Sequence, residues 1–145
     1  MVTKVSAILE QKKIKDIISA KPDTMVIEAL EIMAKYNIGV LVVLDGDKLV
    51  GIFSERDYAR KGIINGRKAK STPMTEVMTA NVYTVKPEMN IKDCMEIMSE
   101  RKFRHLPVMN DDDKVIGVLS VGDIVSALII EQRQHINFLE KYIAG

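Results

Sequence analysis

An internal repeat is the feature that most constrains how this chain can fold. The stretch "GIFSERD" (51–57) returns as "GVLSVGD" (117–123), and "KPDTMVIEALEIM" (21–33) returns as "KPEMNIKDCMEIM" (86–98). The two copies stay in register at an offset of 65 residues up to Val43 and Val108, and at 66 from Lys48 and Lys114 onward. The extra residue falls in an Asp-rich turn, where an insertion costs little. Nearly the whole chain is therefore two copies of one unit.

The beginnings of the two copies align at a different offset. "SAILE" (6–10) matches "TEVMT" (75–79) at 69 residues, because the first copy has a longer connection, "QKKIK" (11–15). We therefore expect a first repeat with an N-terminal helix, a polar linker that contains proline, a second repeat and a C-terminal helical extension. Their expected bounds are 1–63, 64–74, 75–130 and 131–145.

Each copy has the same pattern of secondary structure signals. A short strand (17–20 or 82–85) stops at Lys-Pro, since proline is tolerated at the start of a helix but not inside one. A helix with one apolar face follows, then an apolar run and a second strand that predict a β-hairpin. A further helix starts after Ser54 or Ser120, each a suitable N-cap. The predicted fold class is mixed α/β (α+β), in the order helix, strand, helix, strand, strand, helix, twice.

The last helix is expected to run from Asp123 to about Ile143, well beyond its counterpart in the first copy. Its apolar residues share one stripe at helical spacing. They are Ile124, Leu128, Ile136, Leu139 and Ile143. The stripe either packs on its own domain or forms a dimer contact, and the sequence leaves both open.

Composition excludes several classes of protein. The formal net charge is +1, which argues against a general electrostatic grip on nucleic acid. A single cysteine, Cys94, rules out an internal disulfide framework, and its place on an apolar helix face predicts a buried, unreactive thiol. The start lacks a signal peptide and no stretch is long and apolar enough to cross a membrane, so we expect a cytoplasmic protein.

No set of residues in the sequence indicates catalysis. There is no paired acid and base, no activated nucleophile and no metal-ligand cluster, so we assign no catalytic or metal-binding residue. Neither a dinucleotide fingerprint nor a P-loop is present. We expect that the protein is not an enzyme.

With both copies in register, the quoted segments resemble a tandem pair of CBS domains, also called a Bateman module. The resemblance covers roughly residues 5–130 and is greatest to small stand-alone pairs from prokaryotes and plant organelles. It implies two β-α-β-β-α repeats packed sheet to sheet with pseudo-twofold symmetry. It also implies two clefts between the repeats that commonly bind adenosine ligands, and a homodimer of modules.

The motif Gly-x-x-Ser-x-x-Asp has chemistry that suits such ligands. A carboxylate can accept hydrogen bonds from both hydroxyls of a ribose, and a serine hydroxyl with backbone N–H groups at a helix start suits a phosphate. The alternative is structural: Ser caps the helix and Asp lies at its third position, where it favours the helix dipole. Capping and binding can coexist.

The resemblance assigns residues to each cleft. The primary cleft would contain Ile52, Ser54, Arg56, Asp57, Asn81, Val82, Arg104, His105, Leu106 and Pro107. The second would contain Lys13, Ile17, Ile38, Gly39, Val40, Val118, Ser120 and Asp123. Arg104 and His105 could pair with phosphates, or with acidic groups at the surface or an interface. The second cleft has less positive charge unless Lys12, Lys13 or Lys15 reaches it, so the Asp57 cleft is expected to be the main site. Lys61 is expected on a solvated helix face.

These expectations together predict a regulatory module that senses energy or redox state. It would bind AMP, ADP, ATP or NAD(H), with S-adenosylmethionine ranked after them. Binding would change the conformation or the dimer arrangement and so act on a partner protein of unknown identity. No nucleic acid or membrane partner is expected. The alternative function is a structural or protein-interaction module with no nucleotide ligand.

Overall fold

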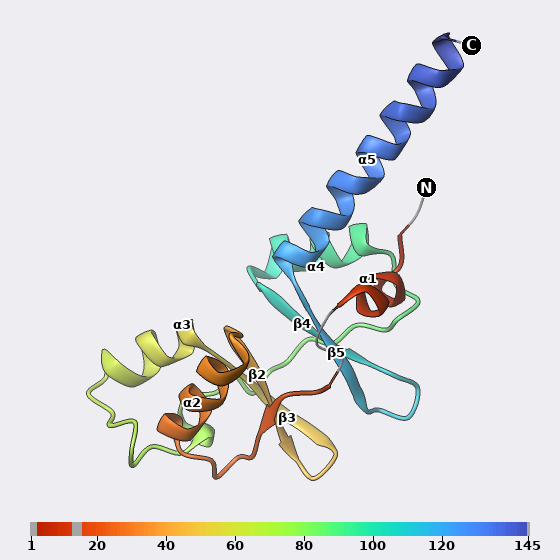
Figure 1. The fold of residues 1–145 in the computed structure, drawn as a ribbon. Coiled ribbons are helices and arrows are strands. Elements are labelled where there is room, and N and C mark those ends of the chain that lie inside the picture. The colour runs from red at the N-terminus through yellow and green to blue at the C-terminus, as the bar shows by residue number, and fades with distance from the viewer. Residues whose placement is uncertain (1–2, 13–15, 145) are drawn as a thin grey trace. The chain divides into compact units, whose positions relative to one another are not determined.

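The computed structural model describes residues 3–12 and 16–144, in which helices alternate with small sheets (Figure 1). The first copy contributes α1 (Val5–Gln11), β1 (Ser19–Ala20), α2 (Val26–Tyr36), β2 (Val40–Asp45), β3 (Lys48–Ser54) and α3 (Glu55–Asp57), which continues as the π-helical η1 (Tyr58–Ile63). The second contributes the 3₁₀ turn η2 (Met74–Glu76), α4 (Ile91–Arg101), β4 (His105–Met109), β5 (Val115–Ser120) and α5 (Val121–Ala144). The predicted mixed α and β class is confirmed. None of the described helices is both long and apolar enough to cross a bilayer.

The chain divides into two compact units, and each unit contains residues from the first copy and from the second copy. Unit 1 contains the described residues of 1–15, 84–111 and 116–145, and unit 2 contains 16–83 and 112–115. The segment that precedes the first copy is therefore grouped with the second copy. The bounds of the two copies in the sequence therefore differ from the bounds of the two packed units.

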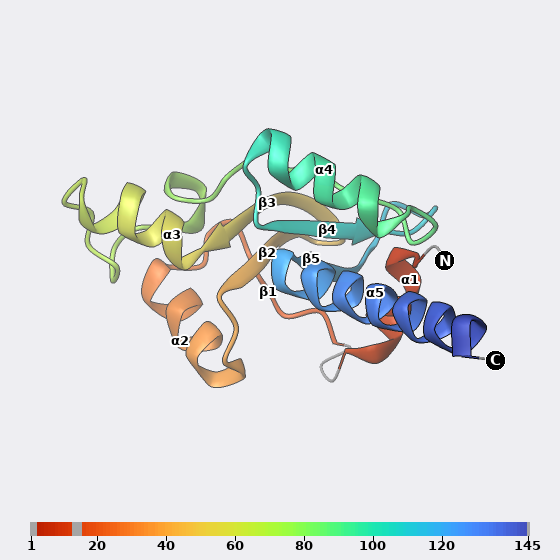
Figure 2. The ribbon, with the colours of Figure 1, turned by 90° about the horizontal axis from the view of Figure 1, so that it is seen from above.

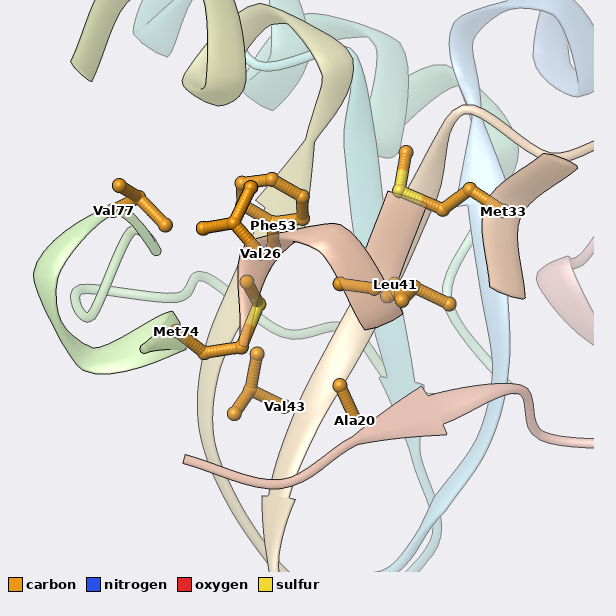
Figure 3. Packing of buried hydrophobic residues seen from close by; sticks show 9 residues of the cluster. Ala20, Val26, Met33, Leu41, Val43, Phe53, Met74 and Val77 are labelled. Carbon is orange, nitrogen blue, oxygen red and sulfur yellow. The ribbon is translucent and has the colours of Figure 1, made fainter. Parts of the chain in front are cut away.

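In unit 2 the sheet has the order β1-β2-β3, with β1 parallel and β3 antiparallel to β2. The apolar face of α2 covers this sheet, and the cluster formed between them is the core of the unit (Figure 3). Phe53 and Met74 are fully buried in it, and residues 69–74 hydrogen bond to the start of α2. The expected linker at 64–74 thus contributes directly to this core, through Met74 and the half-buried Ala69.

In unit 1 the strands β4 and β5 form a two-stranded sheet, and α4 and the first turns of α5 lie against each other beside it (Figures 1 and 2). The expected strand at 82–85 is reduced to one parallel bridge between Val85 and Val108. The physical reason is local: the N–H group of Val82 donates to the carbonyl of Ala80 at 3.1 Å, which turns the backbone away from a ladder.

The segments that lead into the two copies occupy equivalent positions in opposite units. We call residues 3–12 and 74–81 the leading segments. Leu9 of the first packs against Gly117, where a Cβ atom would lie 2.6 Å from Leu9 Cδ2. Met78 of the second packs against Gly51, where a Cβ atom would lie 2.5 Å from Met78 Sδ. The repeated glycine of "GIFSERD" and "GVLSVGD" is therefore explained by close packing.

The long helix α5 is packed only over its first turns. Ile124 is fully buried, but Ile136, Leu139 and Ile143 are 52%, 42% and 82% exposed. Packing of the whole stripe on its own domain, one of the two alternatives that the sequence left open, does not describe these last turns, which extend beyond α1 and α4 in Figure 1. Nothing in the chain described here covers them.

Candidate functional site

The end of β3 places a serine and an aspartate together at the start of α3. Ser54 has extended backbone angles and is the N-cap, since its Oγ accepts the N–H of Asp57 at 3.1 Å. Asp57 Oδ2 accepts the N–H of Ser54 at 2.9 Å in return, which completes a capping box. Ser54 and Asp57 therefore cap the helix, as the structural alternative for this motif predicts. The capping box also holds the Asp57 carboxylate in a fixed orientation at the end of the strand.

The second oxygen of Asp57 faces the leading segment of the second copy. Thr79 Oγ1 donates to Asp57 Oδ1 at 3.2 Å, and Lys61 Nζ lies 3.5 Å from the same oxygen. Thr79 is fixed there because its backbone forms an antiparallel bridge with Ile52. We call Ile52, Ser54, Asp57, Lys61 and Thr79 the Asp57 half-site.

The end of β5 repeats this geometry in unit 1. The N–H of Ser120 donates to Asp123 Oδ2 at 2.9 Å, and the N–H of Asp123 donates to Ser120 Oγ at 3.0 Å. Lys12, the residue that ends α1, donates from Nζ to Asp123 Oδ2 at 2.9 Å and to the carbonyl oxygen of Val118 at 2.7 Å. We call Lys12, Val118, Ser120 and Asp123 the Asp123 half-site.

These contacts change the proton affinity of Asp123. Burial alone would raise the pKa of its carboxyl group, but the hydrogen bonds from Ser120 and Lys12 and the charge of Lys12 outweigh it. The net effect is a pKa below the ordinary value, so the Asp123 carboxyl group is ionised at neutral pH.

His105, at the start of β4, lies within electrostatic reach of the same cluster. Burial lowers the pKa of its imidazole, Lys12 and Arg104 lower it further, and Asp123 opposes them. Asp123 thus acts on the imidazole of His105, a residue that the sequence assigned to the Asp57 cleft, and both residues belong to one compact unit.

The remaining predicted residues are divided between the units. Of the primary set, unit 2 holds Ile52, Ser54, Arg56, Asp57, Asn81 and Val82, and unit 1 holds Arg104, His105, Leu106 and Pro107. Of the second set, unit 2 holds Ile17, Ile38, Gly39 and Val40, and unit 1 holds Val118, Ser120 and Asp123. Lys13 lies outside the described residues. Leu106 is fully buried, so it has only its backbone to offer a ligand.

Backbone hydrogen bonds at the two helix starts follow the same register. The carbonyl of Gly39 accepts the N–H of Glu55 at 3.2 Å, and the carbonyl of Arg104 accepts the N–H of Val121 at 3.0 Å. Gly39 and Arg104 are equivalent positions of the two copies. The backbone carbonyl of each accepts a hydrogen bond from the first residue of the helix that follows the β-hairpin.

Sequence reasoning missed two members of the Asp57 half-site. Lys61 was expected in solvent, but its Nζ also donates to Thr79 Oγ1 at 3.2 Å. The four-residue spacing from Asp57 on one helix is the signal that could have found it. Thr79 has no such signal, because its place depends on a bridge between segments 27 residues apart in the sequence, Ile52 and Thr79.

Cys94 is buried as predicted. Burial, followed by the charge of Asp93, raises the pKa of its thiol to about 11, so it is protonated at neutral pH. A protonated and buried thiol is a poor nucleophile.

Comparison with known proteins agrees with the repeat. The family model described as "CBS domain" matches residues 6–63 and again 74–130. The mitochondrial CBS domain-containing protein CBSX3 of Arabidopsis thaliana is 39% identical over 128 residues, a match that covers 85% of this chain and 62% of that protein. The structure of a putative signal-transduction protein with CBS domains from Burkholderia ambifaria aligns with a TM-score of 0.84 at 42% identity, over 90% of this chain and 96% of that one.

Two further similar structures contain ligands. CBSX2 in complex with AMP aligns with a TM-score of 0.74 at 28% identity, over 89% of this chain and 98% of that one. The CBS domain pair of protein MJ0100, in complex with 5′-methylthioadenosine and S-adenosyl-L-methionine, aligns with a TM-score of 0.76 at 29% identity, over 91% and 99%. The two-copy register, the repeated Ser–Asp geometry and these matches lead to one conclusion: the chain belongs to the CBS-domain family and carries two CBS domains in tandem.

Proposed function

We propose that this protein is a regulatory module that binds an adenosine-type ligand and acts on a partner protein. The observation that carries the proposal is the twofold occurrence of one geometry. At the end of a strand in each unit, a capping box holds an aspartate carboxylate fixed beside a serine. A carboxylate fixed in this way is suited to accept the two hydroxyl groups of a ribose.

The Asp57 half-site is the proposed main site. The cation beside Asp57 is Lys61, whose Nζ is 3.5 Å away and whose side chain is 42% exposed. An exposed ion pair of this length contributes little, typically less than about 1 kcal/mol, so a ligand displaces it at small cost. The hydroxyl of Thr79 can rotate to donate elsewhere.

The ligands proposed are AMP, ADP, ATP or NAD(H), which share an adenosine half. The related structures with AMP and with S-adenosyl-L-methionine support an adenosine ligand as a class. Within this class we propose a nucleotide as the ligand, with S-adenosylmethionine ranked after the nucleotides. The action is proposed to be regulatory rather than catalytic, in a cytoplasmic protein that pairs as a homodimer.

A thermal-shift screen of the purified protein tests the proposal. AMP, ADP, ATP, NAD⁺, NADH and S-adenosylmethionine would be compared on the wild type, Asp57→Ala and Asp123→Ala. A ligand at about 100 times its Kd adds about 2.7 kcal/mol to the stability of the folded state, which raises Tm by about 5–10 °C for a chain of this size. We expect that rise in the wild type and in Asp123→Ala, and its loss in Asp57→Ala.

Other outcomes are equally informative. If the rise in Tm is lost only in Asp123→Ala, the proposed regulatory function stands and the main site is the Asp123 half-site. No shift with any of the six ligands, confirmed by calorimetry, would favour the alternative, a structural or protein-interaction module without a nucleotide. The exposed apolar turns of α5 would then be the first surface to investigate.

A further inference from the structure

The Asp123 half-site differs from the Asp57 half-site in the source of its cation. Lys61 lies one turn beyond Asp57 on the same helix, but the equivalent residue in α5 is Ala127, which carries no charge. The cation on Asp123 comes instead from Lys12, at the end of α1. Lys12 therefore reaches Asp123 only because the leading segment of the first copy packs in unit 1.

The position of Lys12 is set by a well-anchored helix. Val5 and Ile8 of α1 are buried, and Leu9 fills the space that Gly117 leaves open. Backbone N–H groups of Val5 and Ser6 donate to the carbonyls of Met89 and Pro87, both at 2.9 Å. The backbone at Lys12 is therefore held near β5, and leaving the half-site requires only a change of the lysine side-chain rotamer.

One ammonium group occupies two acceptors of the half-site at once. Lys12 Nζ donates to Asp123 Oδ2 at 2.9 Å and to the carbonyl oxygen of Val118 at 2.7 Å. In the Asp57 half-site the equivalent carbonyl, that of Ile52, accepts instead the backbone N–H of Thr79 at 2.8 Å. In the Asp123 half-site the same oxygen is held by a side chain, which can be withdrawn.

We propose that Lys12 competes with the ligand for the Asp123 half-site and so makes the two half-sites unequal. Oδ2 already accepts the N–H of Ser120 and the ammonium of Lys12. A ribose diol that donates to both carboxylate oxygens must take the place of the ammonium. Only molecules in which Lys12 is withdrawn bind the diol, and the apparent affinity falls by that fraction.

This inference rests on the proposed function, and its test separates the two. AMP and adenosine are titrated by calorimetry into Asp57→Ala, which leaves the Asp123 half-site intact, and into Asp57→Ala with Lys12→Met. We expect that Lys12→Met tightens the binding of both compounds by about tenfold. Asp57→Ala with Lys70→Met removes an exposed lysine of the other unit and should leave both affinities unchanged. Lys12→Arg keeps the charge and should keep the weaker binding.

Adenosine distinguishes competition from phosphate binding. If Lys12→Met weakens AMP but leaves adenosine unchanged, Lys12 holds the phosphate and the inference is wrong. It is equally wrong if Lys12→Met changes neither affinity, or if the wild type binds AMP but the Asp57→Ala variants do not bind it with or without Lys12. If neither compound binds the wild type or any variant, the proposed function itself fails. Asp57→Asn replaces Asp57→Ala throughout if circular dichroism shows that the alanine variant is unfolded.

Discussion

At the scale of single residues, the ion pair between Lys12 and Asp123 favours the ionised form of the Asp123 carboxyl group. Both side chains are about one-third exposed or less, so solvent screens the pair only in part. Together with the hydrogen bonds from Ser120, this contact holds the pKa of Asp123 below its ordinary value. Its presence in solution can be measured without any ligand.

We predict that Lys12→Met raises the pKa of Asp123. The substitution removes both a hydrogen bond and a positive charge from the carboxylate, while the bonds from Ser120 remain. The measurement is a pH titration of the carboxyl ¹³C resonance of Asp123 in the two proteins. A carboxyl group whose pKa is lower in the folded than in the unfolded state stabilises the protein at pH values above the unfolded pKa, and this stability is lost as the pH falls through the folded pKa. The wild type should therefore keep more of its stability in mild acid than Lys12→Met does. An unchanged pKa would show that the ion pair does not form in solution.

His105 gives a second pH-dependent prediction. Its pKa is lowered in the folded state, mainly by burial and then by Lys12, with Asp123 acting in the opposite sense and Arg104 in the same sense as Lys12. As the pH falls through the ordinary value of 6.5, the unfolded chain binds a proton first. Stability from this group is therefore full above that pH and is lost as pH falls toward the lower folded value.

Urea unfolding at pH 7.5 and pH 5.5 measures this effect. We expect that the wild type is less stable at pH 5.5 and that His105→Gln removes part of the difference. His135→Gln, on the exposed part of α5, is the matched control and should leave the difference as it is. A pH difference of the same size in His105→Gln and the wild type would contradict the assignment.

At the scale of elements, the packing of the leading segments on β3 and β5 depends on two glycines. A Cβ atom at Gly117 would approach Leu9 Cδ2 to 2.6 Å, so the Leu9 side chain must shift to accept it. At Gly51 the obstacle is Met78 and also the backbone oxygen of Thr79, 3.2 Å from the same position. A side chain on either glycine therefore disturbs the packing of the leading segment beside it.

We predict that Gly117→Ala lowers the free energy of unfolding by about 1–3 kcal/mol, the usual cost of overpacking. Combining it with Leu9→Ala should recover part of this loss, which a double-mutant cycle by urea unfolding would measure as coupling. Gly122→Ala is the control: it lies in α5 with only Ser120 Oγ at 3.7 Å, so it should stabilise the helix by about 0.5–1 kcal/mol. Additive effects of Gly117→Ala and Leu9→Ala would contradict the close packing.

The sequence predicted the order of elements well because the repeat checks each assignment twice. Asn37 and Lys102, equivalent in the two copies, both end their helices in the left-handed conformation. The expected strand at 82–85 was wrong except at Val85, because a turn at Ala80 and Val82 competes with the ladder. Spacing reports which residues share a face, but it does not report which distant segment covers that face. For this reason the role of Lys12 was left open and that of Thr79 was missed.

At the scale of the whole molecule, the exposed apolar turns of α5 bear on assembly. Ile136, Leu139 and Ile143 lie on one stripe of the helix, and Phe138 beside them is 66% exposed. Apolar groups gathered in this way favour burial against another surface. They support the proposed homodimer, with α5 as part of its interface.

We predict that replacing Ile136 and Leu139 by glutamate shifts a dimer to monomers. Charges at the centre of an apolar contact are desolvated without a partner, which typically costs several kcal/mol. Sedimentation velocity measures the mass of the wild type and of the double variant. Gln132→Glu and Gln134→Glu add the same charge to exposed polar positions of the same helix and should leave the mass unchanged. A wild type that sediments as a monomer, or a double variant that stays dimeric, would remove α5 from the interface.

The leading segment of each copy packs against the strand glycine of the other copy, and this arrangement has a consequence for the origin of the chain. A polypeptide with a single copy would carry a leading segment whose binding place lies on another copy. The space beside its strand glycine would be filled only in a dimer, in which the leading segment of each molecule packs on the other molecule. Such a pair is a domain-swapped dimer, and a gene duplication that joined the two ends would give the present connectivity directly. Neither half of this protein should therefore be stable as a monomer, whereas the two halves mixed as separate chains should restore one fold.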